Sequence, residues 1–327
     1  MVSKIVGVGH YLPEKVITNS YFEERNPLFQ YDQNEERTGE PIITSDEWIM
    51  RRMGVAERRE AGKDEYVHHL GAEAAKRALC MAGMQPDDLD GIMLTSVTQK
   101  TRFPSAAIEV QKLIGARNVK EAFDIGAACA GFPLALYHAD LAVQASRGNY
   151  LVVAVDTLRK ITDDTDANAP LFGDGAGAAI LSYTDKREGI LAYSSGSNPF
   201  DGKSGWILQG ESGKLRMPEG KSVMREAIES MVSLSKDIKN QLGWDNKDID
   251  LIIPHQANIR ILKQVGERLG LEGKVFINIE KYGNMSPATC AVGMSEAVEQ
   301  GKIKEGSKAI IVSFGAGLIY TGVGLVY

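Results

Sequence analysis

The most constraining feature of the sequence is an internal similarity at a spacing close to half its length. Residues 86 to 94 read Pro-Asp-Asp-Leu-Asp-Gly-Ile-Met-Leu, and residues 246 to 254 read Asn-Lys-Asp-Ile-Asp-Leu-Ile-Ile-Pro. Residues 148 to 155 resemble residues 306 to 313 in the same way, and a Gly-Ala-Gly run follows each. We therefore predict two related halves that join near residues 183 to 190. Chance similarity between common α/β patterns is the alternative.

Within each half, short apolar runs alternate with longer helical patterns. This alternation predicts parallel strands joined by crossover helices instead of an antiparallel sandwich. Residues 120 to 125 read as a buried strand, and residues 130 to 145 as the helix after it. In the second half, residues 251 to 253 read as a strand and residues 259 to 269 as an amphipathic helix. A third helix is expected from about Ser286 onward.

Composition excludes several classes of protein. The chain has 327 residues, 43% of them hydrophobic and 24% charged, which is typical of a folded globular protein with more than one core. Its net charge of −6 argues against a broad nucleic-acid-binding face. We expect a cytoplasmic protein without membrane insertion, since there is neither a signal-peptide pattern nor a long apolar stretch. Three scattered cysteines predict reduced thiols, with no disulfide framework and no metal site.

Three reactive residues stand in distinctive settings. Cys129 follows Asp-Ile-Gly-Ala-Ala, His255 stands in Ile-Ile-Pro-His-Gln-Ala-Asn, and Asn284 follows Tyr-Gly. Each comes after an apolar, strand-like run and before a helical pattern, which is where an α/β sheet presents side chains to a ligand. A helix N-terminus at Cys129 predicts a lowered thiol pKa and a reactive thiolate. We therefore expect an active site with a thiol nucleophile and two polar partners.

Other residues and motifs have alternative interpretations, most of them structural. Cys80 and Cys290 fall inside helical patterns and are expected to be small buried hydrophobic residues. A turn is an alternative role for Asn284, considered alone. The run from Gly173 to Gly177 lacks the spacing of a phosphate-binding loop and predicts close-packed backbone. A papain-like protease also orders Cys, His and Asn along its chain, but its Cys-Gly-Ser-Cys-Trp signature is missing.

As a set, these motifs resemble the β-ketoacyl-acyl-carrier-protein synthase III family of the thiolase superfamily. The resemblance covers nearly the whole chain and includes Thr44 to Ile49, Gly54 to Arg59, Phe103 to Ala107, Cys129 to Phe132, Phe172 to Ala178 and Pro254 to Asn258. It implies an α/β, thiolase-like fold in which two duplicated βαβαβ halves form a five-layer α-β-α-β-α sandwich. The halves would be residues 1–185, carrying the nucleophile, and residues 186–327, carrying His255 and Asn284. Members are typically homodimers.

The resemblance also implies a reaction. Cys129 would take an acyl group from an acyl-CoA primer, and malonyl-acyl-carrier protein would then bind. His255 and Asn284 would donate hydrogen bonds to the malonyl thioester while it loses carbon dioxide. The backbone N–H groups of Cys129 and Gly317 would hold the oxyanion of the condensation step. Acyl-CoA is a substrate in this scheme, and no cofactor is expected.

Substrate contacts follow from the same resemblance. Trp48 and Arg52 match residues that bind CoA, and either Arg159 or Lys160 would complete the site around adenine. The structural alternative for Trp48 is an anchor on an amphipathic helix.

Two further pairs of residues match the family. Arg260 and Lys263 match a surface that meets the carrier protein, although a solvated charged face is the alternative. Phe103 and Phe172 match the acyl pocket, with Phe103 reaching into the partner subunit or, alternatively, lying in the core.

Departures from the family pattern leave the substrate open. The chain carries an unusual insertion near residues 22–43, which we interpret as a polar loop able to cap the CoA entrance. The residues from Met285 to Cys290 also differ from the usual small ones. The leading interpretation is decarboxylating Claisen condensation that starts fatty-acid or related chain synthesis. The alternatives are an acyltransferase acting on a non-malonyl acceptor and a specialised starter-unit synthase of secondary metabolism.

Overall fold

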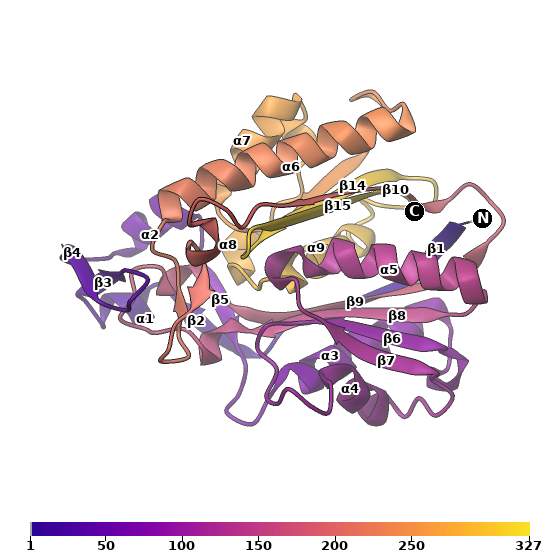
Figure 1. Ribbon diagram of the computed structural model, residues 1–327, viewed down its shortest axis with the longest axis horizontal. Coiled ribbons are helices and arrows are strands. Elements are labelled where there is room, and N and C mark those ends of the chain that lie inside the picture. The colour runs from indigo at the N-terminus through magenta and orange to yellow at the C-terminus, as the bar shows by residue number, and fades with distance from the viewer. Residues whose placement is uncertain (1) are drawn as a thin grey trace.

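The structure is a computed structural model that describes residues 2–327, and its two large β-sheets are separated by a layer of helices (Figure 1). Within these residues, the first sheet has the order β1-β9-β8-β6-β7. Its strands are β1 (Val2–Tyr11), β6 (Gly91–Thr95), β7 (Glu121–Ile125), β8 (Tyr150–Thr157) and β9 (Asp174–Thr184). The second sheet has the order β10-β15-β14-β13. Its strands are β10 (Gly189–Ser197), β13 (Leu251–Pro254), β14 (Lys308–Gly315) and β15 (Ile319–Val326).

Helices form three layers around the two sheets (Figure 1). The outer face of the first sheet is covered by α3 (Val67–Ala82) and α4 (Ala106–Ile114). Between the sheets lie α5 (Gly131–Ser146) and α9 (Ala288–Glu299). The outer face of the second sheet is covered by α6 (Gly220–Leu242), with α7 (Ile259–Leu269) beside it. The predicted five-layer α-β-α-β-α architecture is therefore confirmed.

The repeated segments form equivalent strands in the two sheets. In the first sheet β8 runs parallel to β6 and antiparallel to β9, and in the second β14 runs parallel to β13 and antiparallel to β15. The equivalent of β7 is reduced to a parallel bridge between Ile252 and Val275. The division of the chain after residue 185 remains a prediction, and it falls in the turn between β9 and β10.

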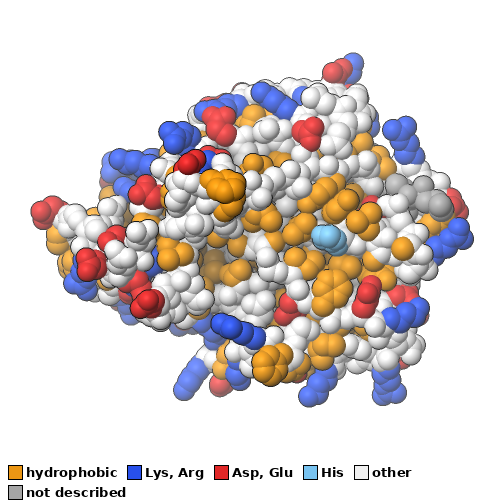
Figure 2. All heavy atoms as spheres, in the orientation of Figure 1, with side chains coloured by type: hydrophobic (Ala, Val, Ile, Leu, Met, Phe, Trp, Pro, Cys, Tyr) orange, Lys and Arg blue, Asp and Glu red, His pale blue; other side chains and the backbone are white. Residues whose placement is uncertain are grey.

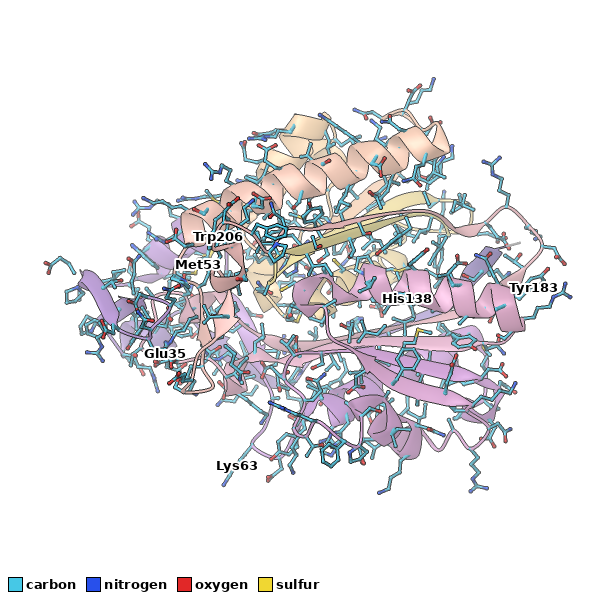
Figure 3. The ribbon with its side chains drawn as sticks, in the orientation of Figure 1. Glu35, Met53, Lys63, His138, Tyr183 and Trp206 are labelled. Carbon is cyan, nitrogen blue, oxygen red and sulfur yellow. The ribbon has the colours of Figure 1, made fainter. Side chains whose placement is uncertain are left out.

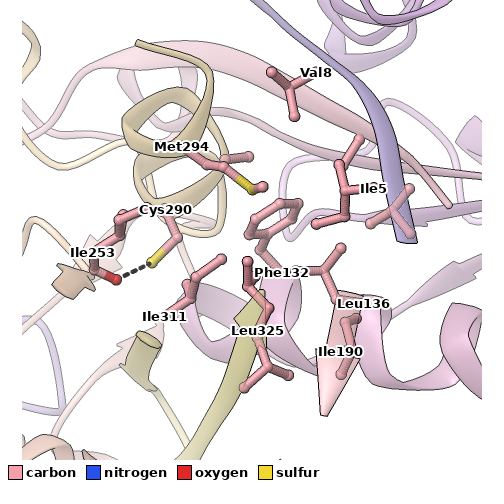
Figure 4. Close-up of a cluster of buried hydrophobic side chains, with 14 of the residues drawn as sticks. Ile5, Val8, Phe132, Leu136, Ile190, Ile253, Cys290, Met294, Ile311 and Leu325 are labelled. Carbon is pink, nitrogen blue, oxygen red and sulfur yellow. Dashed lines mark hydrogen bonds between the residues drawn. The ribbon is translucent and has the colours of Figure 1, made fainter. Parts of the chain in front are cut away.

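A core of apolar side chains fills the space between the sheets (Figure 4). Phe132 of α5 and Met294 of α9 are buried there against residues of both sheets. Cys290 is fully buried in the same core, as predicted. Cys80 is exposed, so its predicted burial is wrong. It lies two residues beyond the buried Ala78, which turns it to the solvent side of α3.

Close backbone approach lets α9 pack on β9. A Cβ atom added at Gly177 would lie 2.5 Å from the Cβ of Ala291, and one at Gly175 would lie 2.5 Å from the Met285 sulfur. The prediction of close-packed backbone over this run is confirmed. Since Asn284 lies shortly before α9, which begins at Ala288, this packing places Asn284 close to the first sheet.

Two predictions about local structure are wrong. The strand at residues 120 to 125 is not buried, because β7 is an edge strand and its residues are partly exposed. The insertion is not a simple polar loop, because its chain folds into α1 (Ser20–Glu23) and a hairpin of β3 (Leu28–Tyr31) and β4 (Arg37–Ile42).

Short elements surround this hairpin on the left side of Figure 1. They are β2 (Lys15–Thr18), α2 (Asp46–Met53), β5 (Glu57–Glu60), β11 (Leu208–Gln209), β12 (Leu215–Arg216) and α8 (Ile279–Tyr282). No helix within residues 2–327 combines the length and the apolar character that a membrane crossing requires.

Candidate active site

The structure brings Cys129, His255 and Asn284 to the wall of one cavity of about 840 Å³. Cys129 follows β7, His255 follows β13, and Asn284 precedes α9, so the two halves of the chain both contribute. The carboxyl ends of parallel strands meet here, as the sequence predicted.

A strained turn presents Cys129 to the cavity. The preceding residue, Ala128, has a backbone φ of 45°, which residues other than glycine rarely adopt. The turn is held from the second half of the chain, because Ser313 Oγ donates to the Cys129 carbonyl at 2.6 Å and Thr321 Oγ1 donates to the Ala130 carbonyl at 2.7 Å. The position of the nucleophile therefore depends on β14 and β15.

The surroundings of the Cys129 thiol oppose its ionisation. Burial raises the pKa of Cys129 to about 12, and the hydrogen bond between its sulfur and Ser286 Oγ, at 3.4 Å, opposes this shift. Cys129 does lie at the beginning of α5, as predicted, but the expected lowering of its pKa is wrong. Burial is the largest influence on this pKa.

His255 is neutral and tied to α9. Burial lowers the pKa of its imidazole to about 3. Its backbone N–H donates to the Val312 carbonyl at 2.9 Å, and its Nδ1 lies 2.6 Å from Thr289 Oγ1. Thr289 Oγ1 also lies 2.9 Å from the Ser286 carbonyl. Because a hydroxyl has one proton, Thr289 either donates to Nδ1 or accepts from it, and this choice sets which ring nitrogen carries the proton.

The Asn284 carboxamide has a fixed orientation. Its Oδ1 accepts the Ser286 backbone N–H at 2.8 Å, so its NH₂ group remains to donate to a ligand. Its backbone pairs with residues around Phe172, where Asn284 N donates to the Leu171 carbonyl at 2.8 Å.

Ser286 and Thr289 were not predicted as active-site residues, although the sequence indicated that a helix starts near Ser286. Their only signal there is their position, two and five residues after Asn284. Ser286 also has a positive φ, of 53°, so two strained residues, Ser286 and Ala128, flank the thiol.

The glycine-rich loop near the C-terminus passes beside the nucleophile. Ala316 of this loop lines the cavity, whereas Gly317 was the residue predicted from the sequence. A Cβ atom at Gly315 would lie 3.0 Å from the Cys129 backbone nitrogen, so the loop runs close to the thiol turn. Ala316 lines the cavity, whereas Gly317 is not among the described residues that do. The φ of +138° at Gly317 explains why glycine is needed there. The role predicted for the Gly317 N–H as an oxyanion donor remains a prediction.

Comparison with known proteins agrees with this geometry. Residues 123–199 match the family 3-oxoacyl-(acyl-carrier-protein) synthase III, and residues 240–327 match the C-terminal part of the same enzymes. The chain is 40% identical over 323 residues to the β-ketoacyl-(acyl-carrier-protein) synthase III of Listeria innocua, which covers 98% of this chain and 97% of that relative. The chain belongs to this family.

Solved structures of synthase III enzymes have the same fold. The crystal structure of the enzyme from Aquifex aeolicus VF5 superposes with a TM-score of 0.90 at 36% identity, covering 99% of this chain and 100% of that one. The enzyme from Pseudomonas aeruginosa PAO1 gives a TM-score of 0.88 at 31% identity, covering 100% and 98%. The thiolase-like fold class is thereby confirmed.

Among the residues matched to CoA binding, Arg52 is the one that lines the cavity within the described part of the chain. Its guanidinium carbon lies 5.0 Å from the centre of the Trp48 ring. Arg159 has a nearly buried side chain that donates to Asp164 and Glu60, so it is committed to these carboxylates. Lys160 donates to two backbone carbonyls at residues 62 and 63. Neither Arg159 nor Lys160 is among the described residues that line the cavity.

The remaining matched residues divide into two groups. Arg260 and Phe172 line the cavity, and Lys263 is exposed one turn along α7 from Arg260. Phe103 is 84% exposed, so the alternative of a core phenylalanine is wrong for the single chain. Among residues 2–327, no group of three or more His, Cys, Asp or Glu side chains is arranged to hold a metal ion.

Proposed function

We propose that this synthase III family member catalyses decarboxylating Claisen condensation of an acyl-CoA primer with malonyl-acyl-carrier protein, starting fatty-acid synthesis. The observation that carries the proposal is the meeting of Cys129, His255 and Asn284 at one cavity in a chain of this family. The proposed chemistry needs only the two thioesters and these side chains.

In the first half-reaction, the Cys129 sulfur attacks the acyl carbonyl. The carbon–sulfur bond to CoA breaks, the acyl group stays on Cys129, and the thiol proton leaves with CoA as its free thiol. The tetrahedral oxyanion is stabilised by backbone N–H groups of Cys129 and of the Gly315-Ala316-Gly317 loop, because this loop passes beside the thiol turn and Ala316 lines the same cavity.

In the second half-reaction, the malonyl group loses carbon dioxide. The electron pair of the broken bond becomes an enolate, whose thioester oxygen accepts hydrogen bonds from His255 Nε2–H and the Asn284 NH₂ group. The enolate carbon attacks the acyl-cysteine, the carbon–sulfur bond breaks, and the Cys129 sulfur regains a proton. The product is a 3-ketoacyl group on the carrier protein.

This role requires the proton of the neutral His255 to be on Nε2. A neutral imidazole has one N–H group, so Nε2–H exists only when Nδ1 accepts a hydrogen bond. The Thr289 hydroxyl is 2.6 Å from Nδ1 and supplies that bond when it rotates away from the Ser286 carbonyl. We assign Thr289 the role of positioning the His255 proton.

The test separates loading from condensation. Wild-type protein is incubated with a panel of acyl-CoA primers, and intact-protein mass spectrometry reports acylation, with Cys129→Ala as the variant expected to stay unloaded. The loaded enzyme then receives malonyl-acyl-carrier protein, and released carbon dioxide is counted. Absence of loading by every primer contradicts the proposal. Loading followed by acyl transfer without carbon dioxide supports the non-malonyl acyltransferase.

We propose that the carrier protein docks beside the cavity mouth. Arg260 Nη2 donates to the Arg51 carbonyl, which keeps its positive charge next to Arg51 and Arg52 at the end of α2. With Lys263 this surface presents a group of cations suited to an acidic carrier protein.

We also propose a cytoplasmic location, because CoA thioesters and reduced thiols occur together there. Cys80, Cys129 and Cys290 are all free, which is compatible with that location.

We also propose a homodimer, whose interface lies on the face shown in Figure 2. Hydrophobic side chains gather there around a pale blue histidine, which Figure 3 labels as His138 of α5. Leu141 on α5 and Phe123 on the free edge strand β7 are 43% and 39% exposed. Exposed edge strands are usually covered, and a second copy would cover this one. Light scattering should then give twice the chain mass of 35.6 kDa.

A further inference from the structure

The hairpin formed by β3 and β4 is part of the cavity wall. Gln30, Tyr31 and Thr38 of this hairpin line the same cavity as Cys129. In Figure 1 the hairpin lies at the left edge of the molecule, whereas α5, which begins just after Cys129, starts near the centre. The cavity therefore extends from the thiol outward to the inserted segment.

A second short hairpin, β11 with β12, lies beside the first and lines the same cavity. Leu208, Gln209 and Leu215 of this hairpin line the cavity, as does Met217 just after it. We call the two hairpins together the outer wall. The outer wall offers apolar surface next to exposed amide and hydroxyl groups, the latter on Gln30, Thr38 and Gln209.

Arg216 joins the two hairpins. Its side chain is 5% exposed, and its Nε donates to Glu35, in the turn between β3 and β4, at 3.2 Å. Its other nitrogens donate to Asp163 and Asp166 at 3.1 and 3.2 Å, and its guanidinium carbon lies 4.0 Å from the centre of the Tyr31 ring. A planar guanidinium that satisfies three carboxylates has little freedom to move.

Further bonds hold the insertion in place. Glu35 accepts hydrogen bonds from both the backbone N–H and the hydroxyl of Ser212, next to β12 (Figure 3 labels Glu35). Phe29 N donates to the Thr165 carbonyl at 2.8 Å, and Ala167 N donates to the Phe29 carbonyl at 2.7 Å. The insertion is thus held against the β11–β12 hairpin and against residues 165 to 167 without a bound ligand.

We propose that the outer wall binds the pantetheine arm of the thioester and so makes the insertion a substrate-binding element of this protein. The inference rests on the proposed function, since it presumes a pantetheine thioester at Cys129. A pantetheine arm is an extended chain that carries two amides, a hydroxyl and a geminal dimethyl group. Amide and hydroxyl side chains beside Leu208, Leu215 and Met217 match this alternation of polar and apolar groups.

The experiment compares thioesters that differ in how much of the arm they carry. The acyl group that loads the wild type best is offered as its CoA, pantetheine and N-acetylcysteamine thioesters, the last of which keeps only the end next to sulfur. The variants are the double variant Gln30→Ala/Thr38→Val, which removes polar groups from the wall, and Glu35→Ala, which separates the hairpins. Glu36→Ala, a neighbouring exposed turn residue, is the matched control for charge.

The proposal predicts that each variant lowers kcat/KM for acylation by the CoA thioester and by the pantetheine thioester to the same extent, which is about tenfold for the double variant. The loss of kcat/KM with the N-acetylcysteamine thioester should be smaller. Equal losses with all three thioesters, or no loss, would overturn it. A loss confined to CoA would also overturn it, because the wall would then contact the nucleotide. If the wild type is acylated by none of the thioesters, the proposed function itself fails, which is a separate result.

Discussion

The inner and outer ends of the cavity are built in different ways. At the inner end, Cys129 and His255 are fixed by backbone and side-chain hydrogen bonds from buried strands, such as those from Ser313 and to Val312. At the outer end, two short hairpins are held together by ion pairs centred on Arg216. Buried strands therefore hold the reactive residues, whereas short surface hairpins form the part of the cavity that we propose to contact the substrate.

The largest expected effect concerns the pH dependence of the inner end. Since burial raises the pKa of Cys129 to about 12, the thiolate fraction should rise with pH throughout the neutral range. We expect the rate of alkylation of Cys129 by iodoacetamide to increase by about tenfold per pH unit from about pH 6 to about pH 9, without a plateau. Peptide mass spectrometry of the Cys129 peptide measures this rate.

The opposite outcome is equally informative. A plateau near neutral pH would mean that the thiolate is already formed there, as the helix-terminus argument from the sequence predicted. Free cysteine, with a pKa of about 8.5, is the reference, because its alkylation rate levels off above that pH.

The next largest effect separates the two half-reactions. His255→Ala removes a donor to the enolate but leaves the thiol turn and the Ser286 contact in place. We expect malonyl decarboxylation to fall by about 10²- to 10³-fold and acylation of Cys129 to fall much less. Carbon dioxide release and intact-mass loading measure the two rates. Equal losses in both would contradict the division of roles proposed for the inner end.

The inner end could largely be predicted from the sequence, and the outer end could not. Cys129 and His255 follow strands whose apolar runs are visible in the sequence, and α7 begins and ends where its periodicity predicts, at Ile259 and Leu269. The strand-like run predicted before Asn284 is wrong, because the short helix α8 precedes that residue. The hairpin of β3 and β4 has mostly exposed residues and so lacks the alternation that reveals a half-buried strand.

Long-range contacts explain the other errors. Arg216 and Glu35 are 181 residues apart, so no local pattern could indicate that they form an ion pair. The pKa of Cys129 depends on burial between the halves, which the local position at a helix terminus does not reveal. Gly315-Ala316-Gly317 is nearly symmetric in sequence, so the sequence could not indicate that Ala316 is the residue of this run that lines the cavity.

A smaller effect is expected from the contact between Thr289 and His255. Thr289→Val removes the hydroxyl that lies 2.6 Å from Nδ1, so the proton is no longer held on Nε2 and a buried nitrogen loses its partner. We expect malonyl decarboxylation to fall by about tenfold or more. Thr289→Ser keeps the hydroxyl and should restore most of the rate. Failure of serine to rescue would mean that Thr289 acts through packing instead of through the proton on His255.

The smallest effect concerns the stability of the outer end. Glu35→Ala removes the pairing with Arg216 and the bonds from Ser212, while the bonds between Phe29 and residues 165 and 167 remain. Local opening of the hairpins should become more frequent, so we expect hydrogen exchange at residues 28–42 and 208–216 to accelerate by about a few-fold. Exchange in α5, which begins just after Cys129, should not change, because buried strands hold it. Faster exchange there as well would show that the two ends are one cooperative unit, and the insertion would then influence reactivity as well as binding.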